Sequence, residues 1–307
     1  LNNSGAIVAG NNVKLEATAG SIANEGAINS GADVFVDAKA GSIVNSADIE
    51  TTSGNVAIKA SGNITNSGKL KAVKVEGESD TGKVTIETES ALVENGAIEA
   101  DNDAELTGAS VEINATVKAG GDAKVEATSG KAEVNNAVSG ANVTISAGAD
   151  VVTGEKGVLT ATDENAKVEV IAEGKIDLKA AVKAEGIGSD VGIKGNGNVS
   201  VGEITAEDKV KVESKNGDVA LKDAISAGSV EAIADGALTT ADTTITTSGN
   251  TNLNGSSIDN QADISSTNGT VEIIAKGSDI KDEEGNTTPS LNNSGAIVAG
   301  NNVKLEA

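Results

Sequence analysis

A unit of about 21 residues that recurs along the chain constrains the fold more than any other feature. The segments Gly5–Asn24, Gly26–Asn45 and Ala47–Asn66 align with aliphatic residues, glycines and asparagines at matching places. Within each unit the apolar residues alternate with other residues, as in Val13-x-Leu15-x-Ala17, which is the period of a β-strand. Helical spacing is not sustained, and glycine recurs too often for long helices. Three short strand-like pieces per unit predict an all-β parallel β-solenoid with one unit per coil.

One aliphatic position can be followed along the whole chain and gives the number of coils. It is occupied by Ile7, Ile28, Ile49, Leu70, Ile98, Val117, Val138, Leu159, Val182, Ile204, Ile225, Ile245, Ile264 and Ile297. These lead aliphatic residues predict about 13 coils of roughly 20 residues, in a single continuous solenoid over residues 1–307. The two longest intervals, before Ile98 and before Ile297, leave room for surface insertions.

The segment Leu1–Ala17 recurs without change as Leu291–Ala307, at an offset of 291 − 1 = 290 residues. Chance does not produce identity over this length. We therefore expect residues 1–290 to be one block of a tandem array and residues 291–307 to be the start of the next identical block. The open strand edges at both ends are then templates on which neighbouring blocks continue, coil on coil.

The alternation of apolar residues also predicts which side chains form the core of the first coils. They are Ile7, Val13, Leu15, Ile22, Ile28, Val34, Val36, Ile43, Ile49, Val56, Ile58 and Ile64. The only aromatic residue, Phe35, lies between two of them and is expected to face outward.

Asparagines recur at one corner of the predicted coils. Asparagine tolerates left-handed backbone angles, and its amide can hydrogen-bond to an identical amide one coil away. The spacing predicts a stacked structural ladder of Asn3, Asn24, Asn45, Asn66, Asn95, Asn114 and Asn135. The alternative is that asparagine is simply a good turn residue.

Charge and composition exclude several classes of function. The net charge of −23 argues against binding to nucleic acid or to anionic membranes, which need clustered Lys and Arg. No apolar run approaches the length of a membrane span, so no membrane insertion is expected in this segment. The chain has no cysteine, so disulfides cannot stabilise it.

Catalysis is not expected, because the chain lacks His, Cys, Arg and Tyr. Solenoid lyases and glycosidases need a base with calcium, or paired carboxylates beside aromatic platforms, whereas the acidic residues here are spread over outward positions. No cofactor is expected. Calcium at Asp282, Glu283 and Glu284 is a weak alternative, since solvated acidic turns explain them as well. An ice-binding face is not supported, because the Thr-rich stretch Thr239–Asn250 does not recur.

The pattern N-x-G-x-I-x-[AS]-G-x-x-V-x-[LV]-x-A-x-x-G-x-I-x-N runs from Asn3 to Asn24 and again from Asn24 to Asn45. It resembles the repeats of filamentous haemagglutinins, large bacterial exoproteins of two-partner secretion systems. The resemblance is clear over roughly the first 70 residues. It implies a right-handed β-helix with triangular coils, export across the outer membrane, and an extracellular position at the cell surface.

The sequence therefore favours a structural role, as a segment of a long extracellular bacterial filament built from tandem β-solenoid blocks. The expected partners are the adjacent blocks, stacked end to end. The alternative is an adhesin, or the stalk of a contact-dependent toxin, whose loops bind cell-surface receptors on host or neighbouring cells.

Overall fold

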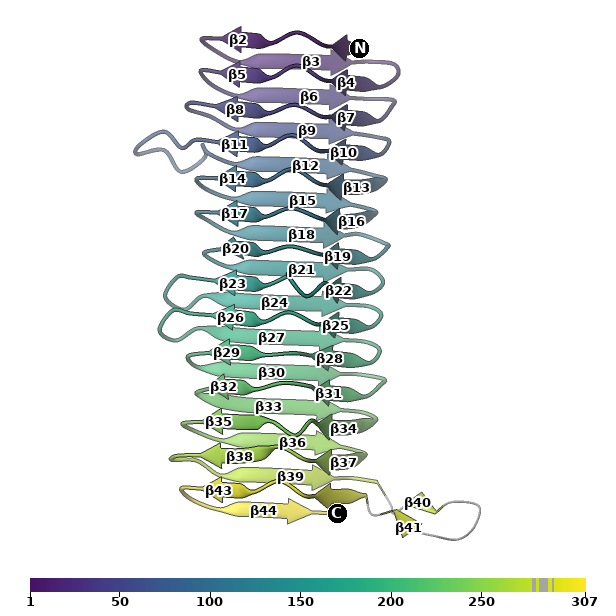
Figure 1. Cartoon of the computed structure of the whole chain (residues 1–307), viewed down its shortest axis with the longest axis vertical. Coiled ribbons are helices and arrows are strands. Elements are labelled where there is room, and N and C mark those ends of the chain that lie inside the picture. The colour runs from purple at the N-terminus through teal and green to yellow at the C-terminus, as the bar shows by residue number, and fades with distance from the viewer. Residues whose placement is uncertain (278–279, 282–286, 289) are drawn as a thin grey trace. The chain divides into compact units, whose positions relative to one another are not determined.

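The computed structural model describes residues 1–277, 280–281, 287–288 and 290–307. The chain forms two compact units, Leu1–Thr160 and Ala161–Ala307. Each unit is a parallel β-solenoid with three strands per coil, and the described residues contain strands and turns but no helix (Figure 1). The two units together hold about 13 coils, so the predicted fold class and coil number are confirmed. The continuity of one solenoid through both units stays a prediction.

The first unit contains three parallel sheets, and each coil gives one strand to each of them. The first sheet comprises β1 (Asn2–Asn3), β4 (Ile22–Asn24), β7 (Ile43–Asn45), β10 (Ile64–Asn66), β13 (Ala91–Glu94), β16 (Ser110–Ile113), β19 (Ala132–Val134) and β22 (Val151–Thr153). The second comprises β2 (Ile7–Ala9), β5 (Ile28–Ser30), β8 (Ile49–Thr51), β11 (Leu70–Ala72), β14 (Ile98–Ala100), β17 (Val117–Ala119) and β20 (Val138–Gly140). The third comprises β3 (Val13–Ala17), β6 (Val34–Ala38), β9 (Val56–Ala60), β12 (Val84–Thr88), β15 (Ala104–Gly108), β18 (Ala123–Ala127) and β21 (Val143–Ala147). Strand β23 (Leu159–Ala161) lies at the boundary of the units.

The second unit also contains three parallel sheets, with one strand from each coil in each sheet. The first comprises β25 (Ile176–Leu178), β28 (Val199–Val201), β31 (Val219–Leu221), β34 (Ala237–Thr240), β37 (Ser257–Asn260) and β42 (Leu291–Asn293). The second comprises β26 (Val182–Ala184), β29 (Ile204–Ala206), β32 (Ile225–Ala227), β35 (Thr244–Thr247), β38 (Asp263–Ser266) and β43 (Ile297–Ala299). The third comprises β24 (Lys167–Ala172), β27 (Asp190–Gly195), β30 (Lys209–Ser214), β33 (Ser229–Ala234), β36 (Thr251–Gly255), β39 (Val271–Ala275) and β44 (Val303–Glu306). A short antiparallel pair, β40 (Ile280–Lys281) and β41 (Thr287–Thr288), lies outside these sheets.

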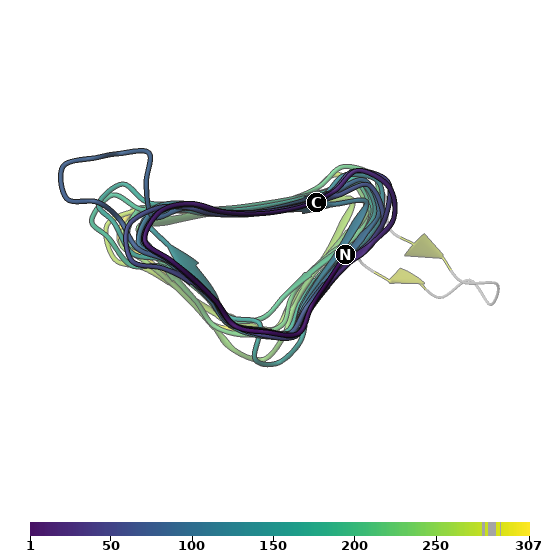
Figure 2. The same cartoon turned by 90° about the horizontal axis from the view of Figure 1, so that it is seen from above.

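The lead aliphatic residues occupy one stacked column of the second sheet in each unit. In the first unit Ile7 pairs with Ile28, Ile28 with Ile49, and the column continues in register to Val138. In the second unit the same column runs from Val182 to Ile297. The coil assignment made from the sequence is therefore correct in each unit. Viewed from above, along the direction in which the coils stack, each coil follows a three-sided path (Figure 2).

Alternation within the strands separates the core from the surface. The predicted core residues are at most 6% exposed, except Ile7 and Leu15, which are half-buried. These two lie in the first coil, where a neighbouring coil covers only one side. Phe35 is 39% exposed and points outward between the buried Val34 and Val36, as expected.

Side-chain oxygens cap backbone groups at the corners before the third sheet. Asn12 Oδ1 accepts a hydrogen bond from the Asp33 N–H at 3.2 Å, and Asp33 Oδ1 accepts one from the Asn55 N–H at 2.9 Å. Asn55 Oδ1 in turn accepts one from the Lys83 N–H at 2.8 Å. Each acidic or amide side chain thus satisfies a donor of the following coil where the strand ladder is interrupted, which explains the Asn and Asp at this corner.

Candidate functional site

A buried ladder of asparagine side chains runs along one corner of the first unit. Asn3 Nδ2 donates to Asn24 Oδ1 at 2.7 Å, and Asn24 Nδ2 donates to Asn45 Oδ1 at 2.6 Å. Asn45 Nδ2 continues the ladder to Asn66 Oδ1 at 2.5 Å. Asn24, Asn45 and Asn66 are at most 1% exposed. Every amide therefore donates in the same direction, toward the following coil.

At Asn45 and Asn66 the side-chain amide also stabilises the corner of its own coil by a hydrogen bond to a backbone carbonyl group. Asn45 Nδ2 donates to the Ala47 carbonyl oxygen at 2.8 Å, and Asn66 Nδ2 donates to the Gly68 carbonyl oxygen at 2.7 Å. At position 68, two places after Asn66, only glycine fits, because an added Cβ would collide with the Ala47 backbone. This packing explains the glycine at position 68.

The structure separates the seven asparagines predicted for one ladder into two sets. Glu94, and not Asn95, is the residue in register with Asn66. Asn95, Asn114 and Asn135 stand one position later, where they form a second ladder with amide hydrogen bonds of 2.9 Å. That second ladder lies at the surface, and Asn95 is exposed. The single ladder was wrong because a shift of one residue moves a side chain to the opposite face of a strand.

Glu94 ends the buried ladder with a carboxyl group. Its Oε1 accepts hydrogen bonds from Asn66 Nδ2 at 2.5 Å and from the Gly96 N–H at 3.0 Å. Its Oε2 is buried and has no hydrogen-bond partner in the part of the chain that the structure describes. Burial raises the pKa of Glu94 to about 8, although the hydrogen bonds from Asn66 and Gly96 oppose this rise. Glu94 is therefore protonated at neutral pH.

The equivalent position of the first sheet is polar at the end of the second unit, where no ladder was predicted. Thr240 Oγ1 donates to Asn260 Oδ1 at 2.8 Å, and Asn260 Nδ2 donates to Asn293 Oδ1 at 2.7 Å. Thr240 and Asn260 are buried. A signal was present: Asn260 precedes Ile264 by four residues, as Asn3 precedes Ile7, and Glu94 precedes Ile98 by the same number.

Residues 291–307, the copied coil, stack on the coil before them in the second unit. Strands β42, β43 and β44 pair in parallel with β37, β38 and β39. The register places Leu291 opposite Ile258, Ile297 opposite Ile264 and Leu305 opposite Ile273. We call the three strands β37, β38 and β39 the junction face. A copy of the sequence that opens the chain is thus seated on the coil formed by β37, β38 and β39.

Polar side chains on the junction face match the copied coil. Asn292 Nδ2 donates to Asp259 Oδ1 at 2.7 Å, and Lys304 Nζ donates to Glu272 Oε1 at 2.8 Å. Asp263 Oδ1 accepts a hydrogen bond from the Ala296 N–H at 2.8 Å. Together with the hydrogen bond from Asn260 Nδ2 to Asn293 Oδ1, these contacts fix both the strand register and the order of the two coils.

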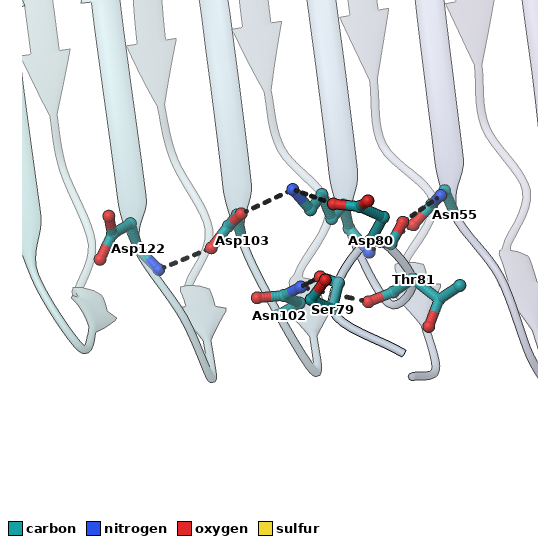
Figure 3. A network of polar contacts seen from close by, with 8 residues as sticks. Asn55, Ser79, Asp80, Thr81, Asn102, Asp103 and Asp122 are labelled. Atoms are coloured by element: carbon teal, nitrogen blue, oxygen red, sulfur yellow. Dashed lines mark hydrogen bonds and ion pairs between the residues drawn. The ribbon is translucent and has the colours of Figure 1, made fainter. Parts of the chain in front are cut away.

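A loop of residues 73–83 projects between β11 and β12, away from the three-sided path of the coils (Figure 2). It is the insertion expected before Ile98. Two asparagines of neighbouring coils hold its base, since Asn55 Nδ2 donates to the Asp80 carbonyl oxygen at 2.9 Å and Asn102 Nδ2 donates to the Ser79 carbonyl oxygen (Figure 3).

An ion pair completes this anchor, with Lys83 Nζ 3.1 Å from Asp103 Oδ2. Glu76 and Glu78, in the outer part of the loop, are exposed. The base of the loop is therefore fixed by side chains of the coils, while its tip is presented to solvent.

The described residues give no evidence for a metal centre. Within them, no group of three or more His, Cys, Asp or Glu side chains is arranged to hold a metal ion. The calcium alternative at Asp282, Glu283 and Glu284 lies outside the described residues and stays untested. The same part of the chain contains no helix long and apolar enough to cross a membrane.

Removing one amide from the buried ladder tests its contribution to stability. In Asn45→Ala the Asn24 amide loses its acceptor and Asn66 Oδ1 loses its donor, both in buried positions. We expect the free energy of unfolding to fall by roughly 2–4 kcal/mol. The surface variant Asn114→Ala, which interrupts the second ladder, should cost less than about 1 kcal/mol. Urea unfolding followed by circular dichroism compares the two, and equal losses would contradict a special role for the buried ladder.

The protonation of Glu94 in the folded protein predicts how the free energy of unfolding depends on pH. Its folded pKa, about 8, lies above the ordinary value of 4.5, so the unfolded chain releases this proton first as the pH rises. The resulting penalty is absent below pH ~4.5, grows between these two values, and is complete above the folded pKa. We expect Glu94→Gln to remove it, so that the variant gains roughly 3 kcal/mol relative to the wild type between pH 4.5 and pH 7.

Urea unfolding of both proteins across this pH range measures the difference. Glu89→Gln changes an exposed carboxyl of the same unit and serves as the control. A difference between Glu94→Gln and the wild type that is independent of pH would show that Glu94 is ionised in the folded protein.

Comparison with known proteins returned no match to a protein-family model, to a curated protein or to a solved structure. The proposal below is therefore supported by the coil geometry, the junction contacts and the pattern of the repeat.

Proposed function

We propose that this chain is a structural segment of a long extracellular bacterial surface filament, in which identical 290-residue β-solenoid blocks follow one another. One observation carries the proposal. The copied coil sits in register on the junction face, with its own hydrogen bonds and an ion pair to that face. A block of this sequence therefore ends on a surface that fits the beginning of the same sequence.

The first coil supplies the other half of this argument. Residues 1–17 pair with β4, β5 and β6 of the following coil. Residues 291–307 have the same sequence, so residues identical to 18 and onward could stack on them in the same way. The blocks then continue without an adapter, and each block adds about 13 coils.

Charge and repeat pattern support an extracellular filament over an intracellular scaffold. The net charge of −23 keeps parallel filaments apart through repulsion. The repeat pattern from Asn3 to Asn45 resembles that of filamentous haemagglutinins, and this resemblance supports a position at a bacterial surface. Adjacent blocks are its partners, and neither a cofactor nor catalysis is part of the proposal.

The spacing of coils gives a direct test. With coils about 4.8 Å apart, 13 coils predict an axial repeat of roughly 60–65 Å along a native filament. Cryo-electron microscopy of filaments from the source cells measures this distance. A loop such as residues 73–83 should appear once per repeat and serves as a marker. An axial repeat far from this range would refute the tandem arrangement.

The loop of residues 73–83 favours a second candidate, an adhesin or toxin stalk whose filament presents binding loops. Its base is held by Asn55 and Asn102 while its tip is exposed, which is how a scaffold displays a recognition segment. Residues of such a segment contribute little to the core, so they are free to vary for binding.

Deletion of the exposed tip tests this candidate. The variant lacking residues 76–78 keeps the anchoring contacts at Ser79 and Asp80 and the coils on either side of the loop, so it should retain the circular dichroism spectrum of the intact chain. If the loop binds a cell-surface receptor, the intact chain should bind cells saturably and the deletion should reduce that binding at least tenfold. Equal binding by both proteins would count against this loop as the contact.

A further inference from the structure

We propose that strand β13 has two registers, and that ionisation of Glu94 shifts the strand by one residue. The shift turns Glu94 out to solvent and brings Asn95 into the buried ladder. We call the arrangement in the structure the observed register and the alternative the shifted register. Strand β13 lies inside the first unit, where it pairs with β10 on one side and with β16 on the other. This pH-dependent switch is therefore independent of how blocks follow one another, and it goes beyond the proposed function.

The two faces of β13 differ less than those of its neighbours, so its register is weakly specified. Leu92 points inward and is buried, but the outward Val93 is also apolar and is half-buried. At the same outward position β10 has Thr65 and β16 has Glu112. A shift of one residue exchanges the two faces of a strand. In β13 it places Val93 in the core instead of Leu92, which loses the burial of about one methylene group.

The shift also replaces a defective end of the buried ladder by an intact one. In the observed register Glu94 faces Asn66, and its Oε2 is buried without a hydrogen-bond partner among the described residues. In the shifted register Asn95 Oδ1 takes the hydrogen bond that Asn66 Nδ2 donates. Asn95 Nδ2 can then donate to the Ala97 carbonyl oxygen, as other asparagines of the ladder do at their own corners. Both polar groups of the inward side chain are thereby used.

The corner that follows β13 becomes one residue shorter in the shifted register. Its inward residues are then Asn95 and Ile98, three places apart. The equivalent corner of one coil in the second unit already has this spacing, between the buried Val201 and Ile204. A glycine follows the first inward residue in both cases. The shorter corner is therefore compatible with stacked coils.

The corner that precedes β13 becomes one residue longer. Thr88 and Val93 are then inward residues five places apart, whereas Thr88 and Leu92 are four places apart in the observed register. The equivalent corner two coils earlier has the longer spacing, between the buried Ala38 and Ile43. The shift can therefore be confined to β13 and its two corners, while the neighbouring coils stay in place.

Ionisation drives the shift because the observed register offers the Glu94 carboxylate neither water nor a cation. Its neighbours in the column, Asn66 and Ile113, carry no charge. The strands packed around it, β11, β12, β14 and β15, present only uncharged residues to the interior. In the shifted register the carboxylate reaches solvent between Thr65 and Glu112. Repulsion by Glu112 opposes the shift, but in water it is weaker than the cost of burying a carboxylate.

The ratio of the shifted to the observed register therefore depends on pH. Burial raises the pKa of Glu94 to about 8 in the observed register, whereas an exposed glutamate has the ordinary value of 4.5. Below both values Glu94 is protonated in either register, and the ratio is constant. Between them the ratio rises about tenfold per pH unit, because only the shifted register is ionised. Above the pKa of the observed register both are ionised, and the ratio levels off.

A single introduced thiol reports the register, because the chain has no cysteine of its own. Leu92→Cys places the thiol inward in the observed register and outward in the shifted one. Its rate of labelling by iodoacetamide is divided by the rate of the same variant unfolded in urea at the same pH. We expect this normalised rate to rise about five- to tenfold per pH unit between pH ~6 and pH ~8. A normalised rate that does not change with pH would overturn the switch.

Two matched variants in the Leu92→Cys background test whether Glu94 is the group responsible. Glu94→Gln removes the ionisable group and should abolish the rise with pH. Glu89→Gln changes an exposed carboxyl at the corner before β13 and should retain the rise. A rise that persists in Glu94→Gln would assign the effect to another group and contradict the proposal.

Local unfolding of β13 would also expose Leu92, and Asn95→Ala separates the two processes. This substitution removes the ladder hydrogen bond of the shifted register, so it should lower the labelling rate of Leu92→Cys at pH ~8 roughly three- to tenfold. Local unfolding gains nothing from Asn95 and would not be slowed. An equal or faster rate in Asn95→Ala would therefore count against a shift of register.

Glu94→Lys provides a second separation at neutral pH. A lysine at position 94 avoids the interior and has Glu112 as an opposite charge at the surface, so it should hold β13 in the shifted register. In this background Leu92→Cys should react rapidly and Val93→Cys should be protected. Rapid reaction of both thiols would mean that β13 is unfolded and would overturn the proposal. If the lysine variant does not fold, the result for Asn95→Ala decides the question.

Discussion

In-register parallel pairing between successive coils is the interaction on which the rest of this structure depends. Each strand hydrogen-bonds to the strands of the neighbouring coils, so residues at equivalent places stand above one another along a unit. A side chain is therefore packed mainly against residues of its own kind. Aliphatic side chains such as Ile28, Ile49 and Leu70 form a continuous column in this way. The hydrophobic core is formed by aliphatic side chains alone, since the one aromatic residue of the chain, Phe35, faces outward.

The same constraint explains how polar side chains are tolerated inside a coil. A buried amide is costly unless its donors and acceptor are used. Stacking places an identical amide within reach in the next coil, so Asn24 donates to Asn45, and Asn45 also donates to the Ala47 carbonyl oxygen of its own corner. Where the column changes to Ile113, no amide follows. Glu94 ends the ladder there because its Oε1 accepts the last donated hydrogen, at the expense of a buried and unpaired Oε2.

Because the sequence repeats, one coil face, the junction face, binds a copy of the segment that opens the chain. The junction face differs from other coil faces in the side chains that meet the copied coil, among them Asp259, Asn260 and Glu272. Backbone pairing alone would accept any coil, since the strands of all coils are alike. The buried amide and the surface charges restrict the choice, because a wrong coil would leave Asn260 without its partner or bring like charges together. The fit of the copied coil to the junction face thus depends on a few polar residues on a common backbone framework.

The period of the sequence was enough to predict the fold, the coils and the inward direction of the aliphatic side chains. A repeat of strand-like alternation can bury its apolar residues only by stacking, and the lead aliphatic residues then mark each coil. Tertiary structure decided which corner residue is interior. Glu94 and Asn95 differ by one place in the sequence, yet only the register with Asn66 buries the first and exposes the second. The protonated state of Glu94 and the fit of the copied coil likewise depend on burial and on partners from distant coils, which a linear pattern does not contain.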